Sequence, residues 1–111
     1  MKFLLPLLFS FAALTWTVAH AAPGDADAGQ AKSQTCAACH NADGNSQNPI
    51  YPILAGQYRN YLVQALHEYR SGSRNNPIMK GFAAGLSDED ILDLAAYFSS
   101  QSSVLVTPKP E

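Results

Sequence analysis

Apolar and polar positions along this chain follow a helical period and show no sheet-like alternation. The clearest helix is predicted over residues 57–71, where apolar side chains recur every three or four positions, at Tyr58, Tyr61, Leu62, Ala65, Leu66 and Tyr69. Gly72 follows, where a helix-ending glycine belongs. Ser87 is an N-cap candidate for a second amphipathic helix, whose apolar face is Ile91, Leu94, Ala95 and Phe98.

Turn-forming residues divide the rest of the chain. Asp25 or Asp27 caps a first helix that we expect to run toward Thr35. Segments 41–49 and 73–85 are rich in Gly, Asn, Ser and Pro and are predicted to be loops. The sequence therefore predicts one all-α domain over residues 22–103, with three to five short helices, and a flexible tail over 104–111.

The first 21 residues resemble an export signal. Lys2 gives a positive start, residues 3–18 are almost wholly apolar, and Ala19 and Ala21 place small side chains where signal peptidase reads them. We expect cleavage after Ala21, a periplasmic location and no stable membrane insertion. The alternative is an uncleaved membrane anchor, although the apolar stretch is short for a span and Pro6 interrupts it.

The net charge of the mature chain bears on which partners it can bind. Once Lys2 is removed with the signal, six basic residues face nine acidic ones, a formal net charge of −3 that argues against nucleic acid. Arg59, Arg74 and Lys80 are candidates for a locally basic docking rim, and residues 88–93 for an acidic patch elsewhere. The alternative is that all of these are solvated surface charges.

The run Cys36-Ala37-Ala38-Cys39-His40 carries the candidate chemistry. Two thiols three positions apart, followed at once by an imidazole, form the attachment site of a c-type haem, in which both sulfurs form thioether bonds and the histidine ligates the iron. A zinc site would need four ligands, but the only other histidines are His20 and His67. A thioredoxin-like pair would need flanking strands, which the pattern lacks. One covalent haem c is predicted.

The iron needs a ligand on its other face, usually Met or His in electron carriers. After processing, Met79 is the only methionine, and it lies in a segment too polar for a core gap-filler. His67 is the competing ligand, but it lies outside the apolar stripe of its helix and is expected to face solvent. An open sixth position is the third alternative. A proline carbonyl in residues 51–56 is a candidate acceptor for the other N–H of His40.

The order of these features resembles the class I c-type cytochromes, and in particular one half of the bacterial two-haem cytochromes c-four. The resemblance rests on Cys-x-x-Cys-His, on Pro-x-Leu-x-Gly and on the stretches at 42–46, 54–57, 86–88 and 95–101, and it covers residues 24–101. It implies a set of haem contacts, namely thioethers at Cys36 and Cys39, axial ligation by His40 and Met79, and a Pro52 carbonyl holding His40. It also implies that Gly29 meets Tyr97 or Phe98 where the first and last helices cross.

Two departures from the family pattern stand out. The two-haem relatives continue into a second domain, so transfer to a second haem within the chain is not expected here. The aromatic residue that the family often carries before the cysteines is missing from residues 31–35.

The resulting expectation is a periplasmic one-electron carrier and not an enzyme, monomeric, exchanging electrons with a membrane cytochrome complex, an oxidase or a dehydrogenase through an exposed haem edge. One alternative is a haem subunit bound permanently to a dehydrogenase or oxidase. The other is a ligand-binding or catalytic haem protein, which the presence of Met79 disfavours.

Overall fold

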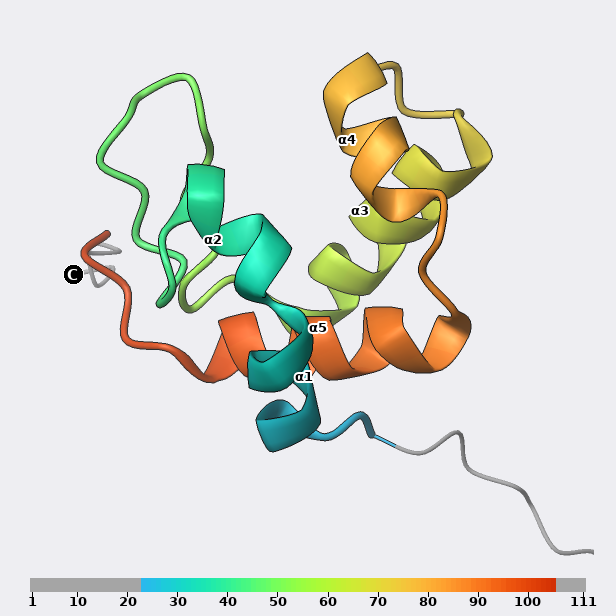
Figure 1. Ribbon diagram of the computed structural model, residues 1–111. Coiled ribbons are helices and arrows are strands. Elements are labelled where there is room, and N and C mark those ends of the chain that lie inside the picture. Colours follow the sequence, from blue (N-terminus) through green and yellow to red (C-terminus); the bar gives the residue numbers. More distant parts are fainter. Residues whose placement is uncertain (1–22, 106–111) are drawn as a thin grey trace, which may run out of the picture.

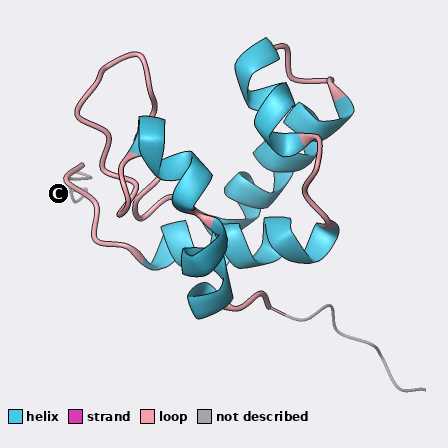
Figure 2. Cartoon of the chain, viewed as in Figure 1, coloured by secondary structure: helices cyan, strands magenta, loops and turns pink. Residues whose placement is uncertain are grey.

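The computed structural model describes residues 23–105, and the expected signal at 1–21 and most of the expected tail lie outside that range. Within it the chain forms five helices and no strand (Figure 2). Their bounds are α1 Ala26–Lys32, α2 Gln34–His40, α3 Arg59–Ser71, α4 Pro77–Ala83 and α5 Asp88–Ser100. The predicted all-α fold is confirmed.

The start of α5 and the end of α3 lie where the sequence predicts them, whereas α3 begins at Arg59, two residues after the predicted start. Before α5, the Ser87 hydroxyl accepts a hydrogen bond from the N–H of Asp90, and the Asp90 carboxylate accepts one from the N–H of Ser87. This reciprocal capping box satisfies two backbone donors that a helix start leaves free. At the end of α3, Gly72 adopts a left-handed conformation with φ 85° and its N–H bonds back to the last turn. Both termini are therefore encoded locally.

The first predicted helix is interrupted. The expectation was one helix running toward Thr35, but α1 ends at Lys32 and α2 starts at Gln34. Ser33 is buried between them, and its hydroxyl donates to the carbonyl of Gln30 at 2.8 Å, a local bond that competes with helix continuation. The break leaves the cysteines and His40 on a helix of their own.

A second difference lies in the segment expected to be a loop over 73–85, which contains α4. Asn76 caps this helix, because its side chain accepts from the N–H groups of Ile78 and Met79. Pro77 occupies the first helical position, where its missing N–H costs nothing. Met79 is therefore held on a short helix.

The helices pack in two groups over α5 (Figure 1). α1 crosses α5 and α2 packs on α1, while α3 packs on another part of α5 and carries α4. The buried core lies where these groups meet α5, with Leu62, Leu94, Ala95, Tyr97 and Phe98 at its centre. Helix α2, which carries the cysteines, packs on α1, and α4, which carries Met79, packs on α3. The two groups are therefore connected through α5.

The crossing of α1 and α5 is close because Gly29 has no side chain. A Cβ there would lie 2.8 Å from the Cβ of Tyr97 and would overlap the Asp93 carbonyl. The predicted contact of Gly29 with the last helix is confirmed for Tyr97.

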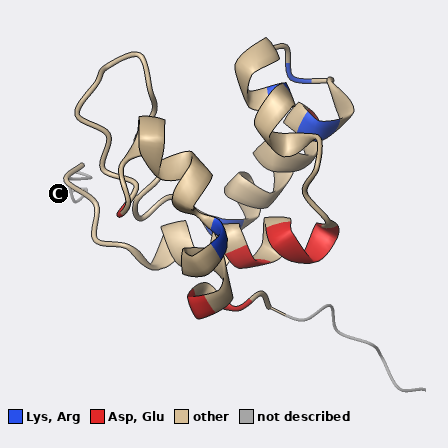
Figure 3. Cartoon of the chain, in the orientation of Figure 1, with Lys and Arg blue, Asp and Glu red and all other residues tan. Residues whose placement is uncertain are grey.

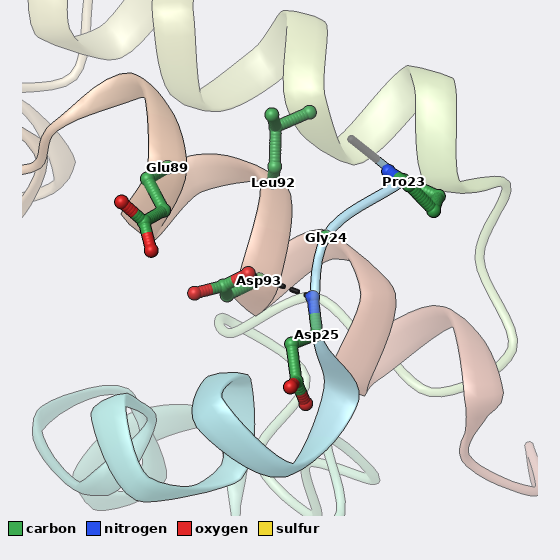
Figure 4. Close-up of a pocket in the computed structure, with 6 residues that line it drawn as sticks. All are labelled: Pro23, Gly24, Asp25, Glu89, Leu92 and Asp93. Carbon is green, nitrogen blue, oxygen red and sulfur yellow. Dashed lines mark hydrogen bonds between the residues drawn. The ribbon is translucent and has the colours of Figure 1, made fainter. Parts of the chain in front are cut away.

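A buried carboxylate fastens the same crossing. Asp93 accepts the backbone N–H of Asp25 at 2.7 Å (Figure 4). It also accepts the ammonium of Lys32 at 2.6 Å. Lys32 also contacts Asp90 at 2.8 Å. The N–H of Asp25 and then Lys32 lower the pKa of Asp93, and hydrogen bonding to Lys32 lowers that of Asp90 to about 2. Both carboxylates therefore stay charged at neutral pH.

Candidate haem-binding site

Helix α2 presents the three motif residues on one side. Cys36, Cys39 and His40 are spaced i, i+3 and i+4, which places them on neighbouring positions of one helix surface. Both cysteines are half-buried and unpaired, and Cys36 packs against the core. Burial raises the pKa of the Cys36 thiol, whereas reactive thioredoxin-like pairs need a lowered pKa. The geometry suits two thioether bonds better than a redox dithiol.

His40 is held in one orientation by a single hydrogen bond. Its ring is 5 % exposed, and Nδ1 lies 2.8 Å from the carbonyl oxygen of Pro52. A carbonyl can only accept, so Nδ1 carries a proton and donates, and in the neutral imidazole Nε2 keeps its lone pair. This is the arrangement of a metal-ligating histidine, and it is the contact that the resemblance implies for Pro52.

The loop that supplies Pro52 is tied to α5 and to itself. The Tyr97 hydroxyl donates to the carbonyl of Ala42 at 2.8 Å, and the N–H of Leu54 donates to the carbonyl of Gly44 at 2.8 Å. Gly44 has φ 79°, and a Cβ there would lie 2.8 Å from the Phe98 ring. These residues support the His40 contact from the core side. Sequence reasoning missed the roles of the Tyr97 hydroxyl and of Gly44, since nothing local in the sequence signals either contact.

The C-terminal segment is anchored beside this loop by Asn45. Its amide donates to the carbonyl of Ser102 at 2.9 Å and accepts from the N–H of Val104 at 2.9 Å. The carbonyl of Asn45 in turn accepts from the amide of Asn41, the residue directly after His40. The sequence marked Asn45 only as a turn former, because its partners lie more than fifty positions away.

Met79 stands in the other helix group. It is half-buried on α4, which packs on α3, and α2 and α4 form no packed pair within residues 23–105. Figure 1 shows α2 and α4 on opposite sides above α5. The two predicted ligands therefore come from separate elements, as ligands on opposite faces of one flat group must.

Large apolar side chains are exposed on and beside α3 and α4, the helix group that carries Met79. The most exposed of those on or beside α3 and α4 are Tyr58 at 84 %, Ile78 at 61 %, Phe82 at 50 % and Tyr61 at 45 %. An exposed apolar set on this scale normally covers a ligand or a partner. An apolar group such as haem is chemically compatible with these exposed side chains. Zinc does not fit, because no three His, Cys, Asp or Glu side chains of the described range are placed to hold a metal ion.

His67 is engaged elsewhere. Its Nδ1 accepts from the Arg70 guanidinium at 2.9 Å, and the same guanidinium donates to Asp88 at 2.6 Å. The side chain is 40 % exposed, in line with the expectation that it faces solvent. The cluster ties the end of α3 to the start of α5.

Of the three cations expected at a docking rim, Arg74 makes several contacts within the chain. The Arg74 guanidinium lies 5.2 Å from the Tyr69 ring centre and 5.7 Å from that of Tyr61, and it donates to the Tyr61 hydroxyl at 3.0 Å. Figure 3 shows basic positions around α3 and α4 and acidic ones along α1 and the start of α5. Arg74 is thus committed to internal contacts, unlike a mobile rim charge.

Comparison with known proteins places the chain. It matches the cytochrome c family over residues 26–102. It is 54 % identical over 84 residues to cytochrome c4 of Pseudomonas aeruginosa, covering 76 % of this chain and 41 % of that protein. It is 53 % identical over 81 residues to cytochrome c-554(548) of Halomonas halodenitrificans, covering 70 % of this chain and 98 % of that one.

Further similarities agree. The crystal structure of reduced recombinant cytochrome c4 from Pseudomonas stutzeri superposes with a TM-score of 0.71 at 45 % identity, covering 74 % of this chain and 48 % of that one. The cytochrome subunit of sulfide dehydrogenase from Chlorobaculum tepidum is 38 % identical over 74 residues, covering 67 % of this chain and 66 % of that protein. The chain spans about half the length of the cytochromes c4 it matches. With its helical fold and its Cys-x-x-Cys-His helix, the chain belongs to the cytochrome c family.

Proposed function

We propose that the chain is a periplasmic c-type cytochrome with a single haem, which carries one electron at a time between redox partners and has His40 and Met79 as axial ligands. The observation that carries the proposal is the hydrogen bond from His40 Nδ1 to the Pro52 carbonyl at 2.8 Å. In the neutral imidazole this bond puts the proton on Nδ1, so that Nε2 is the nitrogen available to the iron, and His40 follows both cysteines on the same helix.

Cys36 and Cys39 hold the haem covalently. Each cysteine would supply its sulfur to one thioether bond with a vinyl carbon of the haem, and its hydrogen to the neighbouring carbon. Because the sequence contains two cysteines, it can attach one haem in this way. The buried position of Cys36 against the core fits an attachment point that stays fixed.

Haem c supplies a one-electron Fe(III)/Fe(II) couple when bound. The residues of the chain prepare its two faces: the Pro52 carbonyl keeps the His40 ring fixed, and α4 presents the neutral thioether of Met79. A methionine ligand favours the ferrous form and raises the potential. With both axial positions filled by side chains, no position is left for a substrate, which supports a carrier rather than an enzyme.

The proposed location and partners follow from the sequence and its relatives. The expected signal at 1–21, cleaved after Ala21, directs the chain to the periplasm. Within residues 23–105, no helix is long and apolar enough to cross a membrane. Membrane cytochrome complexes, oxidases and dehydrogenases are the partner classes that exchange single electrons. Similarity to the cytochrome subunit of a sulfide dehydrogenase favours, as a second candidate, a subunit bound permanently to such an enzyme.

The ligand assignment is tested on the mature ferric holoprotein by the weak far-red absorption of an iron–thioether bond. The wild type should show this band, Met79→Ala should lose it, and the matched control His67→Ala should keep it. A band that survives Met79→Ala, or one that is lost in His67→Ala, would contradict the assignment. Size-exclusion of native extracts then separates a free carrier, eluting at monomer mass, from a subunit that co-elutes with its enzyme.

A further inference from the structure

The connection between α3 and α4 is fastened to α3 through Arg74. The Arg74 N–H donates to the carbonyl of Glu68 at 3.1 Å, and its guanidinium lies over the rings of Tyr61 and Tyr69. The hydrogen bond from the guanidinium to the Tyr61 hydroxyl also fixes the orientation of the guanidinium over the rings. Because Arg74 is held on α3, the backbone two positions later, at residue 76, is also held in place.

Asn76 transmits that position to α4. Its N–H donates to the carbonyl of Arg74 at 3.1 Å, and its Oδ1 accepts from the N–H of Ile78 at 3.1 Å and of Met79 at 3.0 Å. These are the donors that the first turn of a helix leaves free, since Pro77 has none. A helix of seven residues is marginal by itself, so its cap matters more than the cap of a long helix.

We propose that Asn76 is a positioning residue for Met79: by holding the N–H of Met79 and the first turn of α4 to the Arg74 connection, it sets how firmly the Met79 thioether stays on the iron. The inference rests on the proposed function, in which Met79 is an axial ligand. Asn76 acts through the backbone of Met79. Without the cap, the first turn of α4 opens more often and the thioether leaves the iron more often.

The test is competition between Met79 and imidazole added to the mature ferric holoprotein, followed by loss of the far-red absorption. A lost cap of ordinary strength corresponds to about a fivefold gain in imidazole affinity for Asn76→Ala. Asn76→Asp keeps the side-chain acceptor and should bind imidazole as the wild type does. Asn75→Ala changes an exposed neighbour in the same connection and should also leave the affinity unchanged.

Ser87→Ala, which removes the cap of α5, distinguishes a positioning role of Asn76 from a general contribution to stability. The midpoint temperature of thermal unfolding should fall in both Ser87→Ala and Asn76→Ala. The affinity for imidazole should rise only in Asn76→Ala. If Asn76→Ala does not fold, Asn76→Gln, whose amide is one carbon too long for the cap, carries the same comparison.

Two results overturn different statements. If the wild-type band depends on Met79 but Asn76→Ala binds imidazole as the wild type does, the positioning role is wrong and the proposed function stands. If Met79→Ala keeps the band, the ligand assignment fails, and the inference about Asn76 fails with it.

Discussion

At the scale of single residues, hydrogen bonds between distant positions shape the surroundings of the motif. The Pro52 carbonyl decides which nitrogen of His40 carries the proton, and the Tyr97 hydroxyl holds the Ala42 carbonyl just after His40. Tyr97 is 7 % exposed, so its hydroxyl has little access to water that could replace this bond. Each contact joins a loop residue to a residue on a helix.

Tyr97→Phe tests the second of these bonds. The ring keeps its packing against Phe98, but the carbonyl of Ala42 loses its donor, so the free energy of unfolding should fall by about 1 kcal/mol. Tyr58→Phe is the control, because Tyr58 is 84 % exposed. Denaturant titration of both holoproteins measures the difference. Equal stability of the two variants would show that the Tyr97 hydroxyl contributes nothing.

At the scale of elements, α1 and α5 cross in close backbone contact, with no room for a side chain at the crossing point. Gly29 allows the backbones to meet, and Lys32, Asp90 and Asp93 close the crossing with ionic contacts. The backbone approach and the charges stabilise the same pair of helices by different means, and substitutions separate them.

Gly29→Ala should lower the free energy of unfolding by about 2–3 kcal/mol, since the added methyl group would overlap the backbone carbonyl of Asp93 and the Cβ of Tyr97. Gly85→Ala is the matched control, because no atom lies within 4 Å of a Cβ built there. Thermal or denaturant unfolding followed by circular dichroism reports both. A Gly29→Ala protein as stable as Gly85→Ala would mean that the helices do not approach as closely as described.

The ionic contacts should make stability depend on acid. The folded pKa of Asp93 is lowered and that of Asp90 falls from 3.8 to about 2, so the folded state favours both charged forms. Their stabilisation is complete well above the unfolded value of 3.8 and is lost as the pH falls below it, through the lowered folded pKa of each carboxylate, which for Asp90 is about 2. Asp93→Asn should therefore be less stable than the wild type at neutral pH, by a margin that shrinks in this window. Glu89→Gln should keep the wild-type pH slope, and a pH-independent margin for Asp93→Asn would refute the explanation.

Helix ends show where sequence reasoning succeeds. The capping box at Ser87 and the left-handed Gly72 depend on neighbours within a few positions, and both are readable from the sequence. The cap at Asn76 is equally local, but the Gly and Pro around it also suit a loop, so α4 was missed. The break at Ser33 was missed because the same residue types also continue a helix. At the candidate site, the motif itself is predictable, whereas the Asn45 and Tyr97 contacts arise only on folding.

At the scale of the molecule, α5 is the shared support of two helix groups (Figure 1). One group presents the cysteines and His40, the other presents Met79 beside exposed apolar side chains. Acidic positions gather on α1 and the start of α5, away from α4 (Figure 3). This division gives the proposed haem one protein ligand from each group, and it makes the closure of the iron site depend on how the whole chain folds.

A closed, single-haem electron carrier is distinguished from other haem proteins by its redox behaviour in the presence of carbon monoxide. The mature holoprotein is titrated electrochemically while its optical spectrum is recorded, once under argon and once under carbon monoxide. We expect a single one-electron wave at a positive potential that carbon monoxide does not shift, because in the proposed site Met79 fills the position at which the gas would bind. A second wave, or a potential that rises under carbon monoxide, would contradict it.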